Sequence, residues 1–282
     1  MLCPICDSDG LQFYKKIEEF NYYECQHCES LMIDPEVLES IDQGRTITRD
    51  YDDNYWKSEL AAAKERSFSS SLARVAELYL YASKPINKFV DIGTGPGFLL
   101  DALSEFLPVS SSKFFGCELF PPSVYSQHPN YFVGSLGDMP HQFDAGVCVE
   151  VVEHLTPNML RKLATDLAAK STPNSIFLFN TGLPSFVKNH DPGYLDPTIR
   201  GHIVSYGIEG LKTIFNPLGF EITQIDGKEW AFLAEYAPTE IYSSTEVRIW
   251  KACPENVRVL QDRIRGNLLW VLGLDTARAY RT

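Results

Sequence analysis

The chain has 282 residues, of which 44% are hydrophobic and 12% aromatic, so it can bury one large core together with a small second unit. Its 37 acidic residues outnumber the 25 Lys and Arg residues, giving a formal net charge of -12. Proteins that displace counterions from nucleic-acid phosphates present a basic surface, so this balance argues against a nucleic-acid partner. We find no signal-peptide pattern and no apolar run of transmembrane length, and therefore expect a cytoplasmic protein without a membrane partner.

Four of the seven cysteines form two C-x-x-C pairs near the beginning of the chain. These pairs, separated by 18 residues, consist of Cys3, Cys6, Cys25 and Cys28. Each pair presents two thiolates from one tight turn, and four thiolates complete a tetrahedral zinc site. The remaining cysteines are typical of buried free thiols, which argues against disulfides. We predict a zinc ribbon over residues 1–33, with a hairpin of residues 11–14 and 22–24, whose role is structural or, alternatively, to grip a substrate or partner.

Residues 34–84 are predicted to form a linker and a covering helix. The segment 29–56 is rich in Asp, Glu, Pro and Gly, and it ends in Tyr51, Tyr55 and Trp56. Beyond it, from residue 57 to 83, apolar residues recur at helical spacing, at Leu60, Phe68, Leu72, Val75 and Tyr79. This pattern predicts one amphipathic helix that packs on a sheet before its first strand.

A buried strand at residues 89–92 runs into a glycine-rich turn that opens a helix. The turn has the pattern D-x-G-x-G-x-G, formed by Asp91, Gly93, Gly95 and Gly97. Glycine accepts positive φ and has no Cβ, so a ligand can approach the backbone closely here. A dinucleotide fingerprint needs a small third residue at position 98, which is Phe98 in this chain. The turn therefore predicts a nucleotide-like cofactor other than a dinucleotide, bound by these four residues and Thr94.

Strands and helices alternate after this turn. Apolar strands are predicted at residues 113–118, 131–135, 143–150 and 175–180, helices around 157–167 and 211–218, and a final hairpin at 219–222 and 230–234. Such alternation predicts a doubly wound α/β sheet. Glu118 ends the second strand, 21 residues after Gly97, where this fold places the acid that binds a ribose diol.

The segments "VDIGTGPGFLL", "FDAGVCVEVVEHL" and "GHIVSYGIEGLKTIFNPLGFEI" resemble class I S-adenosylmethionine (SAM)-dependent methyltransferases. They are similar to the branch of ubiquinone-type and other small-molecule enzymes, over about residues 85–237. The resemblance implies a Rossmann-like sheet with an antiparallel terminal hairpin, and SAM as the cofactor. It also implies that Tyr51 and Tyr55 lie over the cofactor. Ser135 stands where the family's usual acid would be, and we assign the adenine contact to Ser135 and Leu136 and add Cys148 to the cofactor site.

A second group of polar residues follows the fourth strand. Glu150, Glu153 and His154 share one face if this stretch is helical, and His202 lies in the later segment that we expect to bind the acceptor, residues 181–206. Three interpretations remain open. The residues order the pocket, a histidine acts as general base, or the four bind a divalent cation such as magnesium, manganese or zinc. The third interpretation rests on a resemblance to small-RNA terminal 2′-O-methyltransferases, which have such a cation site. A similar site has been proposed for ubiquinone-type enzymes.

Residues 238–282 are predicted to form a helical extension. Its apolar stripe consists of Val257, Leu260, Ile264, Leu268 and Val271. The stripe would pack either on the core or on a second subunit of a homodimer.

We expect a SAM-dependent methyltransferase whose acceptor is a small metabolite, a sugar or a secondary-metabolite intermediate. Two alternatives remain. A zinc ribbon before a methyltransferase domain also resembles certain ribosomal-RNA guanine methyltransferases, although the acidic composition argues against RNA. The chain could also be a non-catalytic module that binds SAM and serves as an interaction surface.

Overall fold

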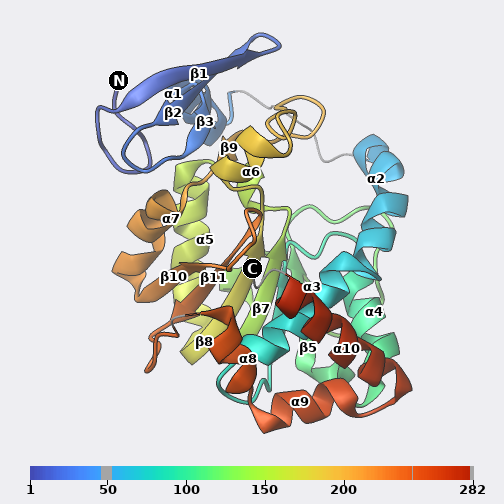
Figure 1. Cartoon of the computed structure of the whole chain (residues 1–282). Helices are drawn as coiled ribbons and strands as arrows, with labels where there is room; N and C mark the ends of the chain where they lie inside the picture. Colours follow the sequence, from blue (N-terminus) through green and yellow to red (C-terminus); the bar gives the residue numbers. More distant parts are fainter. Residues whose placement is uncertain (46–52, 243, 280–282) are drawn as a thin grey trace.

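The computed structural model describes residues 1–45, 53–242 and 244–279. Within them, seven strands form one sheet between two layers of helices (Figure 1). The sheet order is β10-β11-β8-β7-β4-β5-β6. The strands are β4 (Phe89–Ile92), β5 (Phe114–Glu118), β6 (Tyr131–Val133), β7 (Phe143–Val149), β8 (Ser171–Asn180), β10 (Phe220–Gln224) and β11 (Ala231–Tyr236). β11 pairs antiparallel with β8 and β10, while the other pairs are parallel. The predicted Rossmann-like methyltransferase sheet with its antiparallel hairpin is confirmed.

Successive residues of β8 contribute to two separate cores. Phe177 and Phe179 pack with one layer, which includes α5 (Pro157–Lys170) and α7 (Ile208–Phe215). Ile176 and Leu178 pack with the other layer, which includes α3 (Ser70–Tyr81) and α4 (Phe98–Phe106). Apolar side chains fill both faces of the sheet at β8, and in doubly wound folds ligands bind at the carboxyl ends of the strands.

The single helix predicted over residues 57–83 is two helices. α2 (Asp53–Ser67) ends before α3 begins at Ser70, and the Ser69 hydroxyl donates a hydrogen bond to the carbonyl of Glu65. Serine hydroxyls compete with the helical backbone in this way, which favours a break where several serines follow one another. The predicted linker also contains α1 (Pro35–Asp42), which Asp34 caps by accepting from the Glu36 N–H.

The C-terminal extension is helical, as expected, but only the Val257 and Leu260 part of the predicted stripe packs on the core. The extension consists of α8 (Thr245–Trp250), α9 (Pro254–Gln261) and α10 (Ile264–Ala279). On α10, Ile264 and Leu268 are 83% and 60% exposed, whereas Leu269 is buried. A Cβ at Gly273 would lie 3.0 Å from Ala76 of α3. α10 therefore approaches α3 through a small residue, which the apolar spacing did not indicate.

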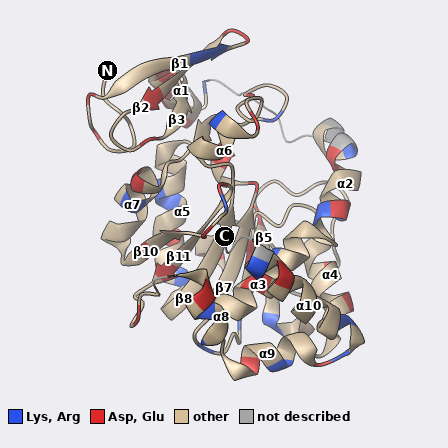
Figure 2. Ribbon diagram, viewed as in Figure 1, with Lys and Arg blue, Asp and Glu red and all other residues tan. Residues whose placement is uncertain are grey.

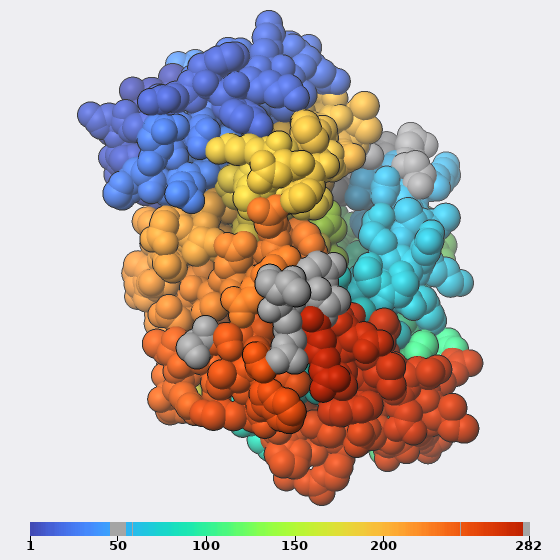
Figure 3. Space-filling model, in the orientation of Figure 1, coloured from blue at the N-terminus to red at the C-terminus, as the bar shows by residue number. Residues whose placement is uncertain are grey.

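The N-terminal ribbon is continuous with the larger unit. β1 (Leu11–Ile17) and β2 (Phe20–Cys25) form the predicted hairpin, and β3 (Leu31–Ile33) pairs with β2. β3 also pairs antiparallel with β9 (Val204–Ser205), which belongs to the acceptor segment. Figures 1 and 3 show the ribbon seated directly on this segment and on α6 (Pro184–Asn189). None of the described helices is both long and apolar enough to cross a membrane.

We expect Arg248→Met to destabilise the protein by about 3–5 kcal/mol, because it leaves a buried carboxylate uncompensated. The Arg248 guanidinium on α8 donates to both carboxylate oxygens of Glu235 on β11, at 2.8 and 2.5 Å, and both side chains are almost completely buried. The free energy of unfolding in urea measures the effect. Lys251→Met, which breaks the exposed pair of Lys251 with Glu240, is the control and should change little. Equal effects of the two substitutions would contradict this assignment.

Candidate functional site

The glycine turn lies at the carboxyl end of β4, next to the ends of β5 and β7. Gly93, Gly95 and Gly97 all have positive φ, at 71°, 54° and 79°. A Cβ at Gly93 would lie 2.5 Å from a methyl group of Val151, and one at Gly97 would lie 2.6 Å from Ser126. The turn therefore requires glycine at these positions both for its backbone conformation and for its close packing.

Glu118 holds this turn from the end of β5. Its carboxylate oxygens accept hydrogen bonds from the Gly95 N–H at 2.9 Å and the Phe120 N–H at 2.8 Å. A carboxylate offers about four lone-pair sites, so Glu118 retains capacity for the hydroxyls of a ribose. Burial raises the pKa of Asp91 at the end of β4 to about 7, while the nearby Thr94 hydroxyl acts in the opposite direction. The predicted acids therefore lie together at the cofactor end of the sheet.

Two aromatic residues that the sequence analysis did not assign contact the glycine turn. The ring of Trp56, on α2, lies 3.2 Å from where a Cβ of Gly95 would be, and Tyr131 donates its hydroxyl hydrogen to the Gly95 carbonyl at 2.5 Å. Tyr55 packs edge-on against Trp56, with ring centroids 4.9 Å apart. Tyr51 lies outside the described residues. The aromatic residue that packs on the turn is thus Trp56, the sequence neighbour of the predicted Tyr55. Only this position next to Tyr55 could have indicated Trp56 from the sequence.

The other residues assigned to the cofactor occupy different environments. Ser135 donates its hydroxyl hydrogen to Asp138 at 2.5 Å, and its N–H bonds the same carboxylate oxygen. The side chains of Leu136 and Cys148 are buried, and burial raises the pKa of the Cys148 thiol well above its usual range. An adenine contact at Ser135 and Leu136 stays a prediction, and Cys148 is a packed thiol rather than a reactive one.

Glu153, His154 and His202 come together beyond the end of β7. Their nearest ligand atoms all lie within 4.8 Å of one another. His202 Nε2 is 3.8 Å from a Glu153 carboxylate oxygen, and the two imidazole rings are 4.9 Å apart. Glu153 is completely buried, and neither of its carboxylate oxygens has a hydrogen-bond partner of good geometry among the described residues. A buried carboxylate of this kind is costly unless a proton or a cation compensates it.

Backbone carbonyls orient both imidazoles. His154 Nδ1 lies 3.0 Å from the Gly201 carbonyl oxygen, and His202 Nδ1 lies 2.8 Å from that of Tyr194. Because a carbonyl can only accept, each Nδ1 carries the hydrogen and each Nε2 carries a lone pair. Burial, together with a smaller effect of His154, lowers the pKa of His202 to about 3, so this imidazole is neutral. A neutral histidine with an oriented Nε2 suits either a general base or a metal ligand.

Glu150 stands beside this cluster rather than in it. Its carboxylate accepts a hydrogen bond from the Asn180 amide at 2.8 Å, and its φ is 55°, in the left-handed region. Burial and the neighbouring Glu153 raise the pKa of Glu150 well above its usual range. The structure therefore brings together Glu153, His154 and His202, three of the four predicted residues, and Glu150 lies beside Glu153. Strained backbone of this kind is concentrated at functional sites.

In the predicted acceptor segment, only some aromatic residues face the cluster. Tyr194 is buried with its ring centroid 4.5 Å from that of His202, and its hydroxyl oxygen accepts from the Gly182 N–H at 2.7 Å. Phe186 packs edge-on against Tyr194. Tyr206 instead donates to the carbonyl of Leu155. The wall of the site beside His202 is therefore Tyr194, supported by Phe186.

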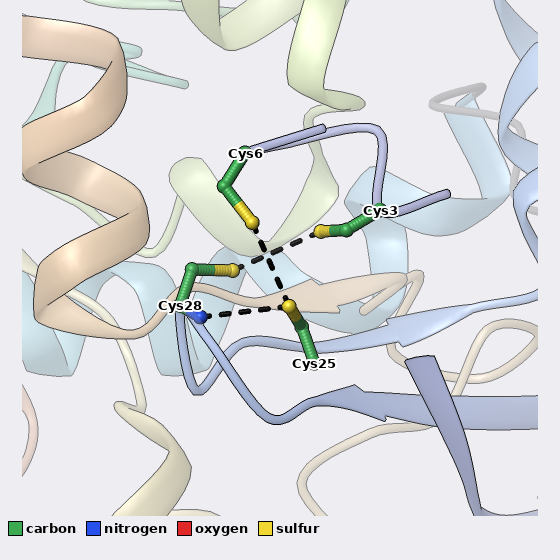
Figure 4. A group of neighbouring side chains, drawn as sticks. All are labelled: Cys3, Cys6, Cys25 and Cys28. Atoms are coloured by element: carbon green, nitrogen blue, oxygen red, sulfur yellow. Dashed lines mark hydrogen bonds between the residues drawn. The ribbon is translucent and has the colours of Figure 1, made fainter. Parts of the chain in front are cut away.

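The four N-terminal cysteines converge on one point (Figure 4). The Sγ atoms of Cys3 and Cys28 are 3.8 Å apart, and those of Cys6 and Cys25 are 3.6 Å apart. A tetrahedral site with Zn–S bonds of about 2.3 Å places its sulfurs about 3.8 Å apart. Burial raises the pKa of Cys25, but backbone N–H groups and the Ser8 hydroxyl outweigh it and lower this pKa to about 6. The residues therefore fit a zinc ion held by four thiolates.

The chain is similar, at low identity, to several solved methyltransferase structures. The SAM-bound aminopentose methyltransferase CalS10 of Micromonospora echinaspora is 17% identical, with a TM-score of 0.47, over 66% of this chain and 98% of that one. The plantazolicin methyltransferase BpumL, solved with S-adenosylhomocysteine (SAH), is 11% identical, with a TM-score of 0.48, over 71% and 98%. A SAM-dependent methyltransferase of Archaeoglobus fulgidus is 20% identical, with a TM-score of 0.44, over 66% and 100%. No protein-family model and no curated protein sequence matches the chain.

The chain has the class I SAM-dependent methyltransferase fold. This statement rests on the sheet with its antiparallel edge hairpin and on the glycine turn at the end of β4. The similarities concern the fold alone, so the assignments that follow rest on the residues of this chain.

We expect the protein to bind SAH and Gly95→Arg to abolish binding, because the new side chain fills the turn against Trp56. Isothermal titration calorimetry measures the affinity. Gly44→Arg is the matched control: Gly44 also has positive φ, but a Cβ there meets nothing within 4 Å, so binding should persist. Glu118→Ala should weaken binding by about 1.5–3 kcal/mol for each charge-assisted hydrogen bond lost. Absence of binding to the wild-type protein, or binding of NAD instead, would overturn the cofactor assignment.

We expect one zinc ion per chain, measured by elemental analysis of protein never exposed to chelator. Cys28→Ser should lose the ion, while Cys253→Ser, at a buried cysteine far from the ribbon in sequence, should retain it. Hydrogen exchange should accelerate in residues 1–33 of Cys28→Ser and also in β9, because β9 pairs with β3. Zinc-free wild-type protein, or a disulfide at Cys3, would refute the zinc site.

Proposed function

We propose that the protein is a cytoplasmic SAM-dependent methyltransferase that acts on a small-molecule acceptor. The observation that carries this proposal is the adjacency of two sites at the carboxyl edge of the sheet. The glycine turn and Glu118 lie at the ends of β4 and β5, while Glu153 and His154 follow β7, the strand paired with β4. When bound, SAM supplies an activated methyl group on a sulfonium, so the protein has mainly to align donor and acceptor.

Each part of the site then has a defined task. The Gly95 region offers its backbone to the cofactor, and Glu118 accepts hydrogen bonds from the ribose. Trp56 packs against the turn at Gly95. Tyr194 forms an apolar wall with a polar tip beside His202, which suits a ring or a sugar. His202 Nε2 lies 3.8 Å from a Glu153 carboxylate oxygen, and in the absence of a cation its lone pair can receive a proton.

We further propose that Glu153, His154 and His202 bind a divalent cation. The support is the buried Glu153 carboxylate, whose oxygens have no hydrogen-bond partner of good geometry among the described residues, together with two imidazoles whose Nδ1 hydrogens are held by carbonyls. Metal-binding histidines in proteins are typically oriented in this way. One carboxylate and two imidazoles suit manganese, zinc or magnesium. A cation there would lower the pKa of an acceptor hydroxyl.

Charge does not favour RNA as the acceptor. Figure 2 shows Lys and Arg interleaved with Asp and Glu over the drawn elements. An excess of 12 negative charges opposes the counterion release on which binding to phosphates depends. The acceptor class that fits is therefore a small polar molecule with a hydroxyl or amine nucleophile.

The test is transfer of labelled methyl groups from SAM to a panel of sugars, sugar nucleotides, phenols and amines, with ribosomal RNA as a separate arm. On the accepted substrate, His202→Gln should lower kcat by about 100-fold or more, while SAH affinity changes less than twofold, because His202 acts on the acceptor side. If the cation is present, chelator should abolish turnover and Mn²⁺ should restore it, and Glu153→Gln should resemble His202→Gln. Insensitivity to chelator would leave His202 as a general base.

SAH binding without transfer to any panel member would favour the non-catalytic module. Transfer to ribosomal RNA alone would favour the RNA methyltransferase.

A further inference from the structure

His202 is held by three hydrogen bonds, and one of them comes from the ribbon. Its N–H donates to the Asp196 carbonyl at 2.9 Å, and its Nδ1 donates to the Tyr194 carbonyl at 2.8 Å. Its own carbonyl oxygen accepts from the hydroxyl of Tyr22 on β2, at 2.8 Å. Tyr22 has no exposed surface, so water does not compete for this hydrogen bond. A residue 180 positions away therefore fixes the backbone of His202.

The next residue joins the ribbon to Glu153. The Ile203 N–H donates to the Glu153 carbonyl at 2.9 Å, and the Ile203 carbonyl accepts from the Ile33 N–H of β3, also at 2.9 Å. The strand pairing then continues, with Met32 opposite Val204. Two members of the candidate site are therefore connected to the ribbon edge through one peptide.

The chain just after β9 contacts the turn that carries Cys28. The Gly207 N–H donates to the Ser30 hydroxyl at 2.9 Å, and the Ser30 hydroxyl donates to the Cys28 carbonyl at 3.4 Å. A Cβ at Gly207 would lie 2.3 Å from that carbonyl oxygen, so only glycine allows this approach. β9 is thus held at its start by β2 and β3 and at its end by the turn that carries Cys28.

The outer part of the hairpin is connected to the acceptor segment as well. Lys188 pairs with Glu24 at 2.7 Å, and Thr198 donates to Glu18 at 2.8 Å. These contacts are exposed and contribute little free energy. The buried contact of Tyr22 with His202 is the one that can set geometry at the site.

We propose that the ribbon positions the candidate catalytic histidine and that Tyr22 is the positioning residue through which it does so. The proposal rests on the proposed function for the role of His202. A Tyr22 that only filled space in the ribbon would affect stability when changed to Phe, but it would leave the His202 ring where it is. Loss of the hydroxyl leaves a buried carbonyl without its donor, so the peptide of His202 is expected to shift.

The test uses the full-length, zinc-loaded protein labelled with ¹³C at histidine Cε1. Six histidine signals are expected, and the loss of one in His202→Gln assigns His202. Tyr22→Phe should move the His202 signal, and 4-aminophenylalanine at position 22, which restores a donor, should return it toward the wild-type position. Tyr23→Phe is the matched control, because Tyr23 is the next residue of β2 and its ring packs edge-on against Phe13 within the hairpin. The control should leave the His202 signal unmoved.

A second measurement is Mn²⁺ affinity by electron paramagnetic resonance. Residues that orient metal ligands typically change affinity by about 10- to 100-fold, and we expect about a tenfold loss in Tyr22→Phe. Zinc content and SAH affinity should remain those of the wild type, since neither site contains Tyr22. If the wild-type protein binds no Mn²⁺, the cation proposal fails, but the histidine signals still decide the role of Tyr22.

An unmoved His202 signal in Tyr22→Phe, or an equal movement in Tyr23→Phe, would overturn the proposal. If Tyr22→Phe does not fold, 3-fluorotyrosine at position 22 replaces it, because this residue changes the strength of the donor and almost none of the packing. The His202 signal must then move, and a signal that stays in place overturns the proposal in the same way.

Discussion

The antiparallel pairing of β3 with β9 is the contact on which the candidate site depends. The Ile33 N–H of the ribbon donates a hydrogen bond to the Ile203 carbonyl, next to the paired residues of this ladder. The Ile203 N–H in turn donates to the Glu153 carbonyl. β9 has only two residues, and such a short strand gains stability only from the strands beside it. The three ribbon strands supply that support, and the four cysteines hold their turns together. The ribbon is therefore part of the architecture of the site.

The large sheet determines where chemistry can take place. The faces of its central strands are mostly apolar, and strand order reverses on either side of β4, so the fold favours ligand binding at the carboxyl edge at β4, β5 and β7. The glycine turn and Glu118 lie at the ends of β4 and β5, and the cluster follows β7, so the proposed donor and acceptor sites adjoin.

The sequence was sufficient to predict those features that a single local pattern determines. The glycine turn, Glu118, the strand alternation and the cysteine pairs could all be read locally, because φ preferences, burial and ligand spacing act within short segments. β9 could not be predicted, since two residues carry no periodicity. The contacts of Trp56 with Gly95 and of Tyr22 with His202 could not be predicted either, because these partners lie far away in the chain. On α10 the apolar spacing indicated the wrong face, because Gly273 allows the close approach to α3.

Burial explains why the ribbon matters for Glu153 and His202 in particular. Neither group is exposed to water by more than 6% of its surface, and burial raises the pKa of Glu153 while it lowers that of His202. Both side chains are therefore held away from their charged forms by the same exclusion of water. That exclusion depends on the segment 194–206, and this segment is connected to the ribbon at its buried edge through Tyr22 and Ile33. A ribbon that opened would admit water to both groups, so the folding of the ribbon and the burial of the site are physically linked.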